Sequence, residues 1–188
     1  MPKIRRVMIN FIHDQASRYH PWKIFYIPGL ALLFGSVVIG IIYSAVWLDN
    51  RLELEGPFVF PFNLLLAVPV LAAGLLLVTW CNLLFIKAKG SPVPLHPPKV
   101  LVVKGPYALT RNPMITGVFL LLTGMGIIYN SVIVVFVLSP LFILVAAVEL
   151  KWIEEPELEK RLGDDYVRYR QQTPMFFPGL HRRHNKER

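Results

Sequence analysis

The sequence predicts an all-α, polytopic membrane protein with four transmembrane helices. The last two helices form a tight hairpin, and a cytoplasmic C-terminal helix follows. Three observations predict this class. Hydrophobic residues make up 54% of the 188 positions, a high share for a soluble domain. They gather in four long runs, and a helix needs roughly 20 mostly apolar residues to span a membrane. Lys and Arg flank these runs instead of interrupting them.

The runs divide one predicted domain, residues 1–188, into five segments. Residues 1–23 have no continuous apolar stretch, and we expect a basic amphipathic helix on the membrane surface. Residues 24–86 contain two spans, 24–48 and 58–86, and residues 87–113 form a cytoplasmic loop. Residues 114–153 contain the other two spans, separated only by Tyr129, Asn130 and Ser131, so we expect an antiparallel hairpin. Residues 154–188 form a cytoplasmic C-terminal segment.

The distribution of positive charge predicts the topology. Five Lys and Arg residues precede the first run, and the three following loops hold one, five and none. Nine more occur from Lys151 onward. Because cytoplasmic loops of membrane proteins are enriched in Lys and Arg, we expect both termini to be cytoplasmic. The formal net charge of +8 is therefore interpreted as contact with lipid headgroups and not with nucleic acid.

Other motifs are interpreted structurally. The GxG at Gly124 and Gly126 lies in the middle of a span, where small residues favour helix packing and no dinucleotide fingerprint is expected. The histidines show no metal-ligand spacing with Cys81, so no metal site is expected. Cys81 is interpreted as a small buried hydrophobic residue. The stretch from Ser91 to Lys99 has four prolines and should be extended. It leads into the apolar, strand-like KVLVV and a turn at GPY.

The predicted hairpin places residues 105–114 beside Glu149–Glu155. Glu149 lies within an apolar run, where an ionisable residue suggests a functional site; a snorkelling interface residue is the alternative. Glu154 and Glu155 could equally cap a new helix, because Pro156 suits a first helical position and LEKRLGDDYVRYRQQ suggests one polar helix. His96, in the second loop, is either a base or a solvated loop residue.

Two segments resemble a known family. GPYALTRNPMITG (105–117) resembles the G-x-Y-x-x-x-R-[HN]-P-x-Y-x-G element of the isoprenylcysteine carboxyl methyltransferase and phospholipid methyltransferase superfamily. EEPELEKRLGDDYVRYRQQTPMFFP (154–178) resembles the tail motif of the same superfamily. The order and separation of the two elements match, over nearly half of the chain. Two departures matter for function. Ile115 replaces a tyrosine of the motif, and Leu150 stands where the carboxyl methyltransferases carry an arginine.

The resemblance implies an integral membrane enzyme that uses S-adenosyl-L-methionine and releases S-adenosyl-L-homocysteine. Residues 87–113 would then be the cofactor loop. Arg111 and Glu149 would be the catalytic residues, with Arg111 bracing the site or meeting an anionic group. The residues implied in cofactor binding are Lys99, Val100, Leu101, Val102, Tyr107, Asn112, Pro113, Met114, Ile115, Glu154 and Glu155. Carboxylates at a low-dielectric rim would bind the cationic cofactor strongly.

We therefore expect a lipid or lipidated acceptor to be methylated at the cytoplasmic face of the bilayer, without nucleic acid as a partner. An isoprenylcysteine-type carboxyl O-methyltransferase is favoured slightly over a phosphatidylethanolamine-type N-methyltransferase. A non-enzymatic membrane scaffold or binder with the same fold is the alternative from another class. The sequence does not predict the oligomeric state.

Overall fold

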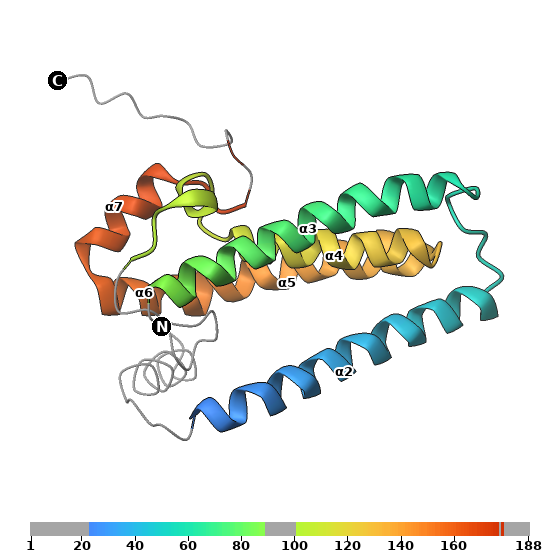
Figure 1. Cartoon of the computed structure of the whole chain (residues 1–188), viewed down its shortest axis with the longest axis horizontal. Coiled ribbons are helices and arrows are strands. Elements are labelled where there is room, and N and C mark those ends of the chain that lie inside the picture. The colour runs from blue at the N-terminus through green and yellow to red at the C-terminus, as the bar shows by residue number, and fades with distance from the viewer. Residues whose placement is uncertain (1–22, 89–100, 177, 179–188) are drawn as a thin grey trace. The chain divides into compact units, whose positions relative to one another are not determined.

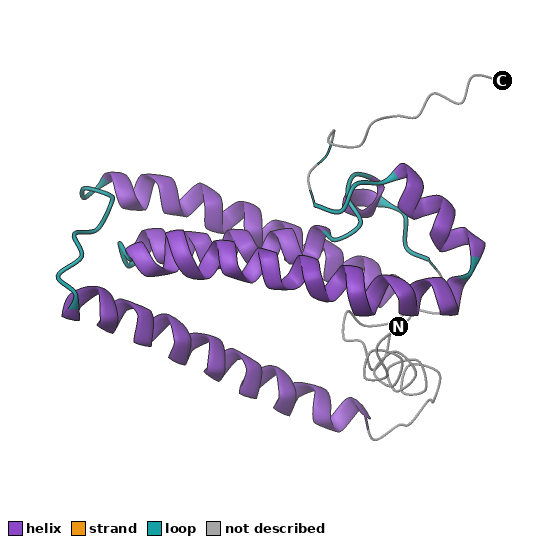
Figure 2. Ribbon diagram, turned by 180° about the vertical axis from the view of Figure 1, so that it is seen from behind, coloured by secondary structure: helices purple, strands orange, loops and turns teal. Residues whose placement is uncertain are grey.

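The computed structural model describes residues 23–88, 101–176 and 178. Every regular element within these ranges is a helix, as Figures 1 and 2 show. The predicted all-helical class is therefore confirmed for this part of the chain. The predicted surface helix before Lys23 and the proline-rich stretch Ser91–Lys99 lie outside the described residues. In chain order the elements are α2 (Lys23–Arg51), α3 (Phe62–Lys87), the 3-10 turn η1 (Gly105–Ala108), α4 (Pro113–Ile128), the π-helical turn η2 (Val134–Leu138), α5 (Ser139–Glu149), the π-helical turn η3 (Leu150–Glu154), α6 (Glu155–Leu162) and α7 (Asp164–Gln172).

The chain forms two compact units. Of the described residues, the first unit holds 77–88, 101–116, 146–176 and 178. The second holds 23–76 and 117–145. All of the described residues that the sequence predicts for the site belong to the first unit.

Two helices of the described chain are long and apolar enough to cross a membrane, Phe62–Lys87 and Val134–Leu162. The helix Pro113–Ile128 is also apolar but shorter. Large apolar side chains such as Leu65, Leu76 and Leu144 stay exposed on these helices. A soluble monomer rarely shows so much contiguous apolar surface, whereas lipid would cover it. The full set of four spans stays a prediction.

Polar contacts close one end of the second unit. The buried carboxylate of Asp49, in the last turns of α2, accepts hydrogen bonds from the Ser131 hydroxyl and from the Ile133 N–H at 3.2 Å. Both donors lie at the start of the helix that contains η2. The first N–H groups of a helix have no acceptor within the helix, and Asp49 supplies one. Asn130 (φ 52°) forms the turn after α4, and its Oδ1 accepts the Phe58 N–H at 3.0 Å.

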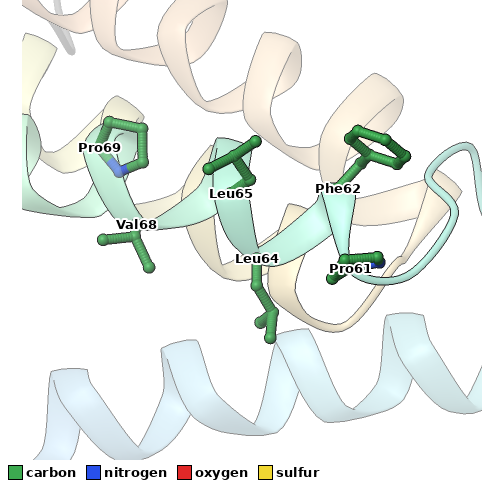
Figure 3. A pocket seen from close by; sticks show the side chains of 6 residues that line it. All are labelled: Pro61, Phe62, Leu64, Leu65, Val68 and Pro69. Carbon is green, nitrogen blue, oxygen red and sulfur yellow. The ribbon is translucent and has the colours of Figure 1, made fainter.

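The predicted start of the second span is four residues too early, because α3 begins at Phe62 and not at Phe58. The Phe62 N–H instead closes a turn onto the Val59 carbonyl at 2.8 Å. Proline favours turns and first helical positions, which accounts for the shift at Pro61. The first turns of α3 line a groove of about 610 Å³, in which Leu64 points toward α2 (Figure 3). Its six lining residues are all apolar, so it offers no group for chemistry: Pro61, Phe62, Leu64, Leu65, Val68 and Pro69.

The interpretation of Glu154 as a cap of a new helix is wrong. Glu154 has helical dihedrals (φ −71°, ψ −49°), and its side chain makes no capping hydrogen bond. The helix continues through η3, where the Glu155 N–H donates to the Leu150 carbonyl five residues back. A π-helical turn is wider than an α-helical one. It thereby makes room just before Pro156, whose ring would clash with the preceding turn of a regular helix.

Two further expectations about the first unit are wrong. Leu101, Val102 and Val103 have no regular secondary structure and form no strand. The predicted single polar helix from Leu158 to Gln172 is broken at Gly163, which has φ 60° and ψ −140°. Only glycine adopts such a conformation readily. The chain therefore turns between α6 and α7, and α7 comes to lie beside η1 (Figures 1 and 2).

Candidate active site

The segment that carries the first motif begins with a glycine whose backbone conformation other residues rarely adopt. Gly105 has φ 61°, and a Cβ atom there would lie 3.2 Å from atoms of Trp80 and Leu84. It opens the 3-10 turn η1, which buries Tyr107. The Tyr107 ring packs edge-on against Phe85, with 5.5 Å between ring centroids, and its hydroxyl contacts Cys81. The turn is thus anchored to the end of α3.

The C-terminal segment holds the same loop through its backbone. The Arg111 N–H donates to the Pro174 carbonyl at 2.8 Å, and the Asn112 N–H donates to the Met175 carbonyl at 3.1 Å. Asn112 in turn accepts the Thr116 N–H at 3.2 Å in the first turn of α4. Pro113 begins that helix and has no N–H, so no unsatisfied backbone donor arises at this position. The residues before α4 are therefore fixed from both sides.

A buried ion pair joins the two motifs. Arg111 Nη1 contacts the Glu155 carboxylate, and the side chains are only 12% and 8% exposed. Arg170 Nη1 lies 3.8 Å from the other carboxylate oxygen of Glu155. The expected proximity of residues 105–114 to Glu149–Glu155 is therefore observed. Arg111 also has an unsatisfied donor, since its Nε is buried without a hydrogen-bond partner.

Glu154 differs from Glu155 in having no such partner. Within the part of the chain that the structure describes, its carboxylate makes no hydrogen bond and no ion pair. Its neighbours in electrostatic range are mostly of like charge, namely Glu149, Glu155 and Glu157, with Arg161 opposing them. A half-buried carboxylate among other carboxylates is unfavourable unless a cation binds to it. Glu154 is therefore the group best suited to receive a positively charged ligand.

Glu149 is exposed and precedes η3, five residues before Glu154. In an α-helix, residues five apart point to different faces. In a π-helical turn the hydrogen bonds join residues five apart, and such residues are stacked more closely. The electrostatic proximity of the two glutamates agrees with this geometry. Single π-helical turns are frequent at functional sites.

The other predicted site residues lie around this centre or outside the described chain. Lys99 and Val100 fall outside the described residues. Leu101 and Val102 are half-buried in the segment before η1. At the start of α4, Pro113 is buried, while Met114 and Ile115 are half-buried. The structure thus brings Tyr107, Arg111, Asn112 and Glu155 together, with Glu149 and Glu154 on the adjoining turn.

Sequence reasoning missed three side chains of α7. The Tyr169 hydroxyl donates to the Tyr107 carbonyl at 2.6 Å. Tyr166 is buried and lies beside Arg111, and Arg170 shares Glu155 with Arg111. Burial raises the pKa of each of Tyr107, Tyr166 and Tyr169 above the usual range, so all three hydroxyls stay protonated donors at neutral pH. Two tyrosines spaced i, i+3 in an otherwise polar helix are the signal that could have found this face.

The described side chains contain no group of three His, Cys, Asp or Glu that could hold a metal ion. The described side chains at this centre offer charges and hydrogen-bonding groups. Glu154 offers an unpaired negative charge, Arg111 an unused donor, and Glu149 an accessible carboxylate. Such a set can bind a ligand that carries both charges, and can accept a proton.

Comparison with known families matches the chain to a family model. The model described as "PEMT: Phospholipid methyltransferase" matches residues 62–165, which is more than half of the chain. The matched region includes both glutamates of the pair and Arg111. A comparison with curated proteins gave no match.

Proposed function

Because the chain belongs to the phospholipid methyltransferase family, a membrane family that methylates lipids, we propose that it uses S-adenosylmethionine to methylate a lipid amine. The single observation that carries this proposal is the unpaired carboxylate of Glu154 beside the buried Arg111–Glu155 pair. Methyltransferases of this kind generally take their methyl group from S-adenosylmethionine. When bound, that cofactor supplies a methyl group on a sulfonium, which is transferred by in-line displacement.

The residues present fit the cofactor. Its α-ammonium and sulfonium are cationic, and Glu154 is a carboxylate without a partner. Its carboxylate needs a donor, and Arg111 Nε is a buried donor without an acceptor. A charge-assisted hydrogen bond is roughly twice as strong as a neutral one. Pairing Glu154 and Arg111 Nε with the cofactor's charged groups would therefore favour binding. Tyr107 and the start of α4 would form the apolar walls.

The surroundings of Glu149 support an amine acceptor. A carboxylate acceptor needs a nearby cation, yet Leu150 is only 2% exposed and apolar, and Arg111 is already paired with Glu155. An ammonium headgroup is instead attracted by Glu149. It must lose a proton before its nitrogen can attack, and Glu149 is an exposed carboxylate that can take that proton.

A carboxyl O-methyltransferase of the isoprenylcysteine type, which the sequence slightly favoured, is the second candidate. Lys151 supports it, because this exposed cation follows Leu150 directly and could meet an anionic acceptor. The non-enzymatic alternative loses its main support, since it required the glutamate pair to cap a helix, and Glu154 makes no capping hydrogen bond.

We also propose that four spans cross the bilayer with both termini in the cytoplasm. The 29 residues of α2 are sufficient to span it, and Leu32, Leu33 and Ile39 on this helix are exposed. The polar helices α6 and α7, with the site, would then lie at the cytoplasmic face, where the water-soluble cofactor is available.

The test is methyl transfer from S-adenosylmethionine labelled in the methyl group into total membrane lipids, followed by mass spectrometry. N-methylation predicts a label that resists mild alkali, because a C–N bond is not hydrolysed. Carboxyl methylation predicts a label that alkali releases as methanol. Labelling that the wild type and Glu154→Gln share equally, or no labelling by either, would overturn the proposal.

A further inference from the structure

Tyr169 is the one side chain of α7 whose hydroxyl reaches the backbone of the first motif. It donates to the Tyr107 carbonyl at 2.6 Å and lies 3.4 Å from the Thr110 carbonyl. Directly after η1, the Leu109 and Thr110 N–H groups both donate to the Pro106 carbonyl. The carbonyls of Tyr107 and Thr110 receive no such backbone bond there. A buried carbonyl without a partner is costly, so Tyr169 satisfies a need that η1 cannot meet itself.

The same helix ends where the tail begins to hold the loop. The Thr173 N–H closes the last turn of α7 onto the Tyr169 carbonyl at 3.0 Å. The next two residues accept the N–H groups of Arg111 and Asn112. Tyr169 therefore lies at the junction of two contacts to one loop. Its hydroxyl fixes the start of the loop, and the residues after it fix the end.

This loop carries the groups that the proposed function assigns to the cofactor. Tyr107 lies at its start, Arg111 in its middle, and α4 begins just after it. The side chains of Tyr107 and Arg111 are each held on their far side, by Phe85 and by Glu155 respectively. What remains to be fixed is the backbone between them, and the Tyr169 hydroxyl contacts that stretch at Tyr107 and Thr110. Positioning of this kind matters because displacement of about 1 Å can cost a hundredfold in rate.

We propose that Tyr169 is a positioning residue, which sets the backbone from Tyr107 to Thr110 so that Arg111 and Tyr107 meet S-adenosylmethionine. It does not touch the cofactor itself. The inference rests on the proposed function, because it concerns the same cofactor site. Burial raises the pKa of Tyr169, so its hydroxyl remains a donor throughout the pH range in which the protein is assayed.

The experiment is calorimetric titration of S-adenosylmethionine alone into the full chain in detergent micelles, which yields both a Kd and a number of sites. Tyr169→Phe keeps the ring and removes the donor. Its Kd should rise about tenfold, as when only about a tenth of the free protein keeps the loop in its binding-competent conformation, while the number of sites stays the same. A role in folding alone would lower the number of sites and leave the Kd unchanged. Tyr43→Phe, at a tyrosine 72% exposed on α2, is the matched control.

A second variant tests the donor itself. Replacing Tyr169 by p-aminophenylalanine restores an N–H at the same ring position, and the Kd should return to within about twofold of the wild type. An unchanged Kd in Tyr169→Phe would overturn the inference. So would a Tyr169→Phe protein that fails to fold while the p-amino variant folds, because the hydroxyl would then act in folding alone. Absence of binding by the wild type would instead overturn the proposed function.

Discussion

The guanidinium of Arg111 and the carboxylate of Glu155 form a buried ion pair between the loop before α4 and the start of α6. The two residues are 44 positions apart in the chain. Each belongs to one of the two motifs that resemble the methyltransferase superfamily. Among the described residues, the Nε of Arg111 has no hydrogen-bond partner and the carboxylate of Glu154 has mostly like-charged neighbours; these are the groups that the proposed function assigns to the cofactor.

Replacing one partner of this ion pair should destabilise the protein more than replacing both partners. Arg111→Met leaves a buried carboxylate with only the more distant Arg170, and should lower the free energy of unfolding by about 3 kcal/mol. The double variant Arg111→Met/Glu155→Met should recover most of that loss, because apolar replacements of a buried pair are often neutral. Unfolding by SDS in mixed micelles measures both effects.

The exposed pair Arg168–Asp165, at 2.6 Å, is the matched control for this cycle. Both of its side chains lie mostly in solvent, where ion pairs contribute little, so Arg168→Met should leave the unfolding transition unchanged. Equal losses at the two pairs would show that the burial of Arg111 and Glu155 has no energetic consequence.

Glu149→Gln should slow the reaction without weakening the binding of S-adenosylmethionine. The amide keeps the size of the side chain but cannot take a proton, and general-base catalysis contributes on the order of 10²-fold or more. We expect kcat to fall by about that factor with an amine acceptor, while the KM for S-adenosylmethionine stays within twofold. Steady-state kinetics with the labelled lipid measure both. An unchanged kcat would identify Glu149 as a residue of the membrane interface.

The two glycines with positive φ should respond differently to alanine. Gly105 and Gly163 have nearly the same φ, 61° and 60°, so each substitution introduces backbone strain of about 1–3 kcal/mol. A Cβ at Gly105 would also press on Trp80 and Leu84, whereas Gly163 faces open space. Gly105→Ala should therefore have the lower melting temperature and the weaker affinity for S-adenosylmethionine. The reverse order would contradict the tight packing of η1 against α3.

Asp49→Ala should destabilise the second unit. The substitution removes the acceptor of the Ser131 hydroxyl and of the Ile133 N–H, and the loss of a helix-capping acceptor costs about 1–2 kcal/mol. Asp49→Asn keeps one acceptor oxygen and should lose less. Asn50→Ala, at the exposed neighbour, serves as the control. Melting curves in detergent distinguish these variants, and equal melting temperatures for all three would refute the capping role.

Much of the helical framework could be predicted because its signals are local. Long apolar runs predict helices in water or lipid alike, and three predicted spans end within a few residues of the observed helices. The meeting of Arg111 and Glu155 also followed from the sequence, because only three residues separate the two apolar runs that lead to them. Two prolines account for the main differences from the prediction. Pro61 delays the start of α3, and Pro156 is accommodated by a π-helical turn inside a continuing helix.

The rest could not be predicted because it depends on contacts distant in sequence. The residues after α7 hold Arg111 and Asn112 through backbone hydrogen bonds. Such bonds do not depend on which side chains are present, so the sequence does not predict them. A π-helical turn likewise has no sequence signature of its own. It brings Glu149 and Glu154 closer together than an α-helix would. Tyr169 was missed for a related reason, since its partners are carbonyl groups and not side chains.

The central claim is that Glu154 binds a cationic cofactor, and titration calorimetry with S-adenosylmethionine tests it most directly. We predict that the wild type binds. Glu154→Gln should bind at least about tenfold more weakly, the effect expected for the loss of a hydrogen bond to a charged group. Asp164→Asn, which removes an exposed carboxylate of α7, should bind like the wild type. Equal affinity for the wild type and Glu154→Gln, or no binding by the wild type, would contradict the assignment.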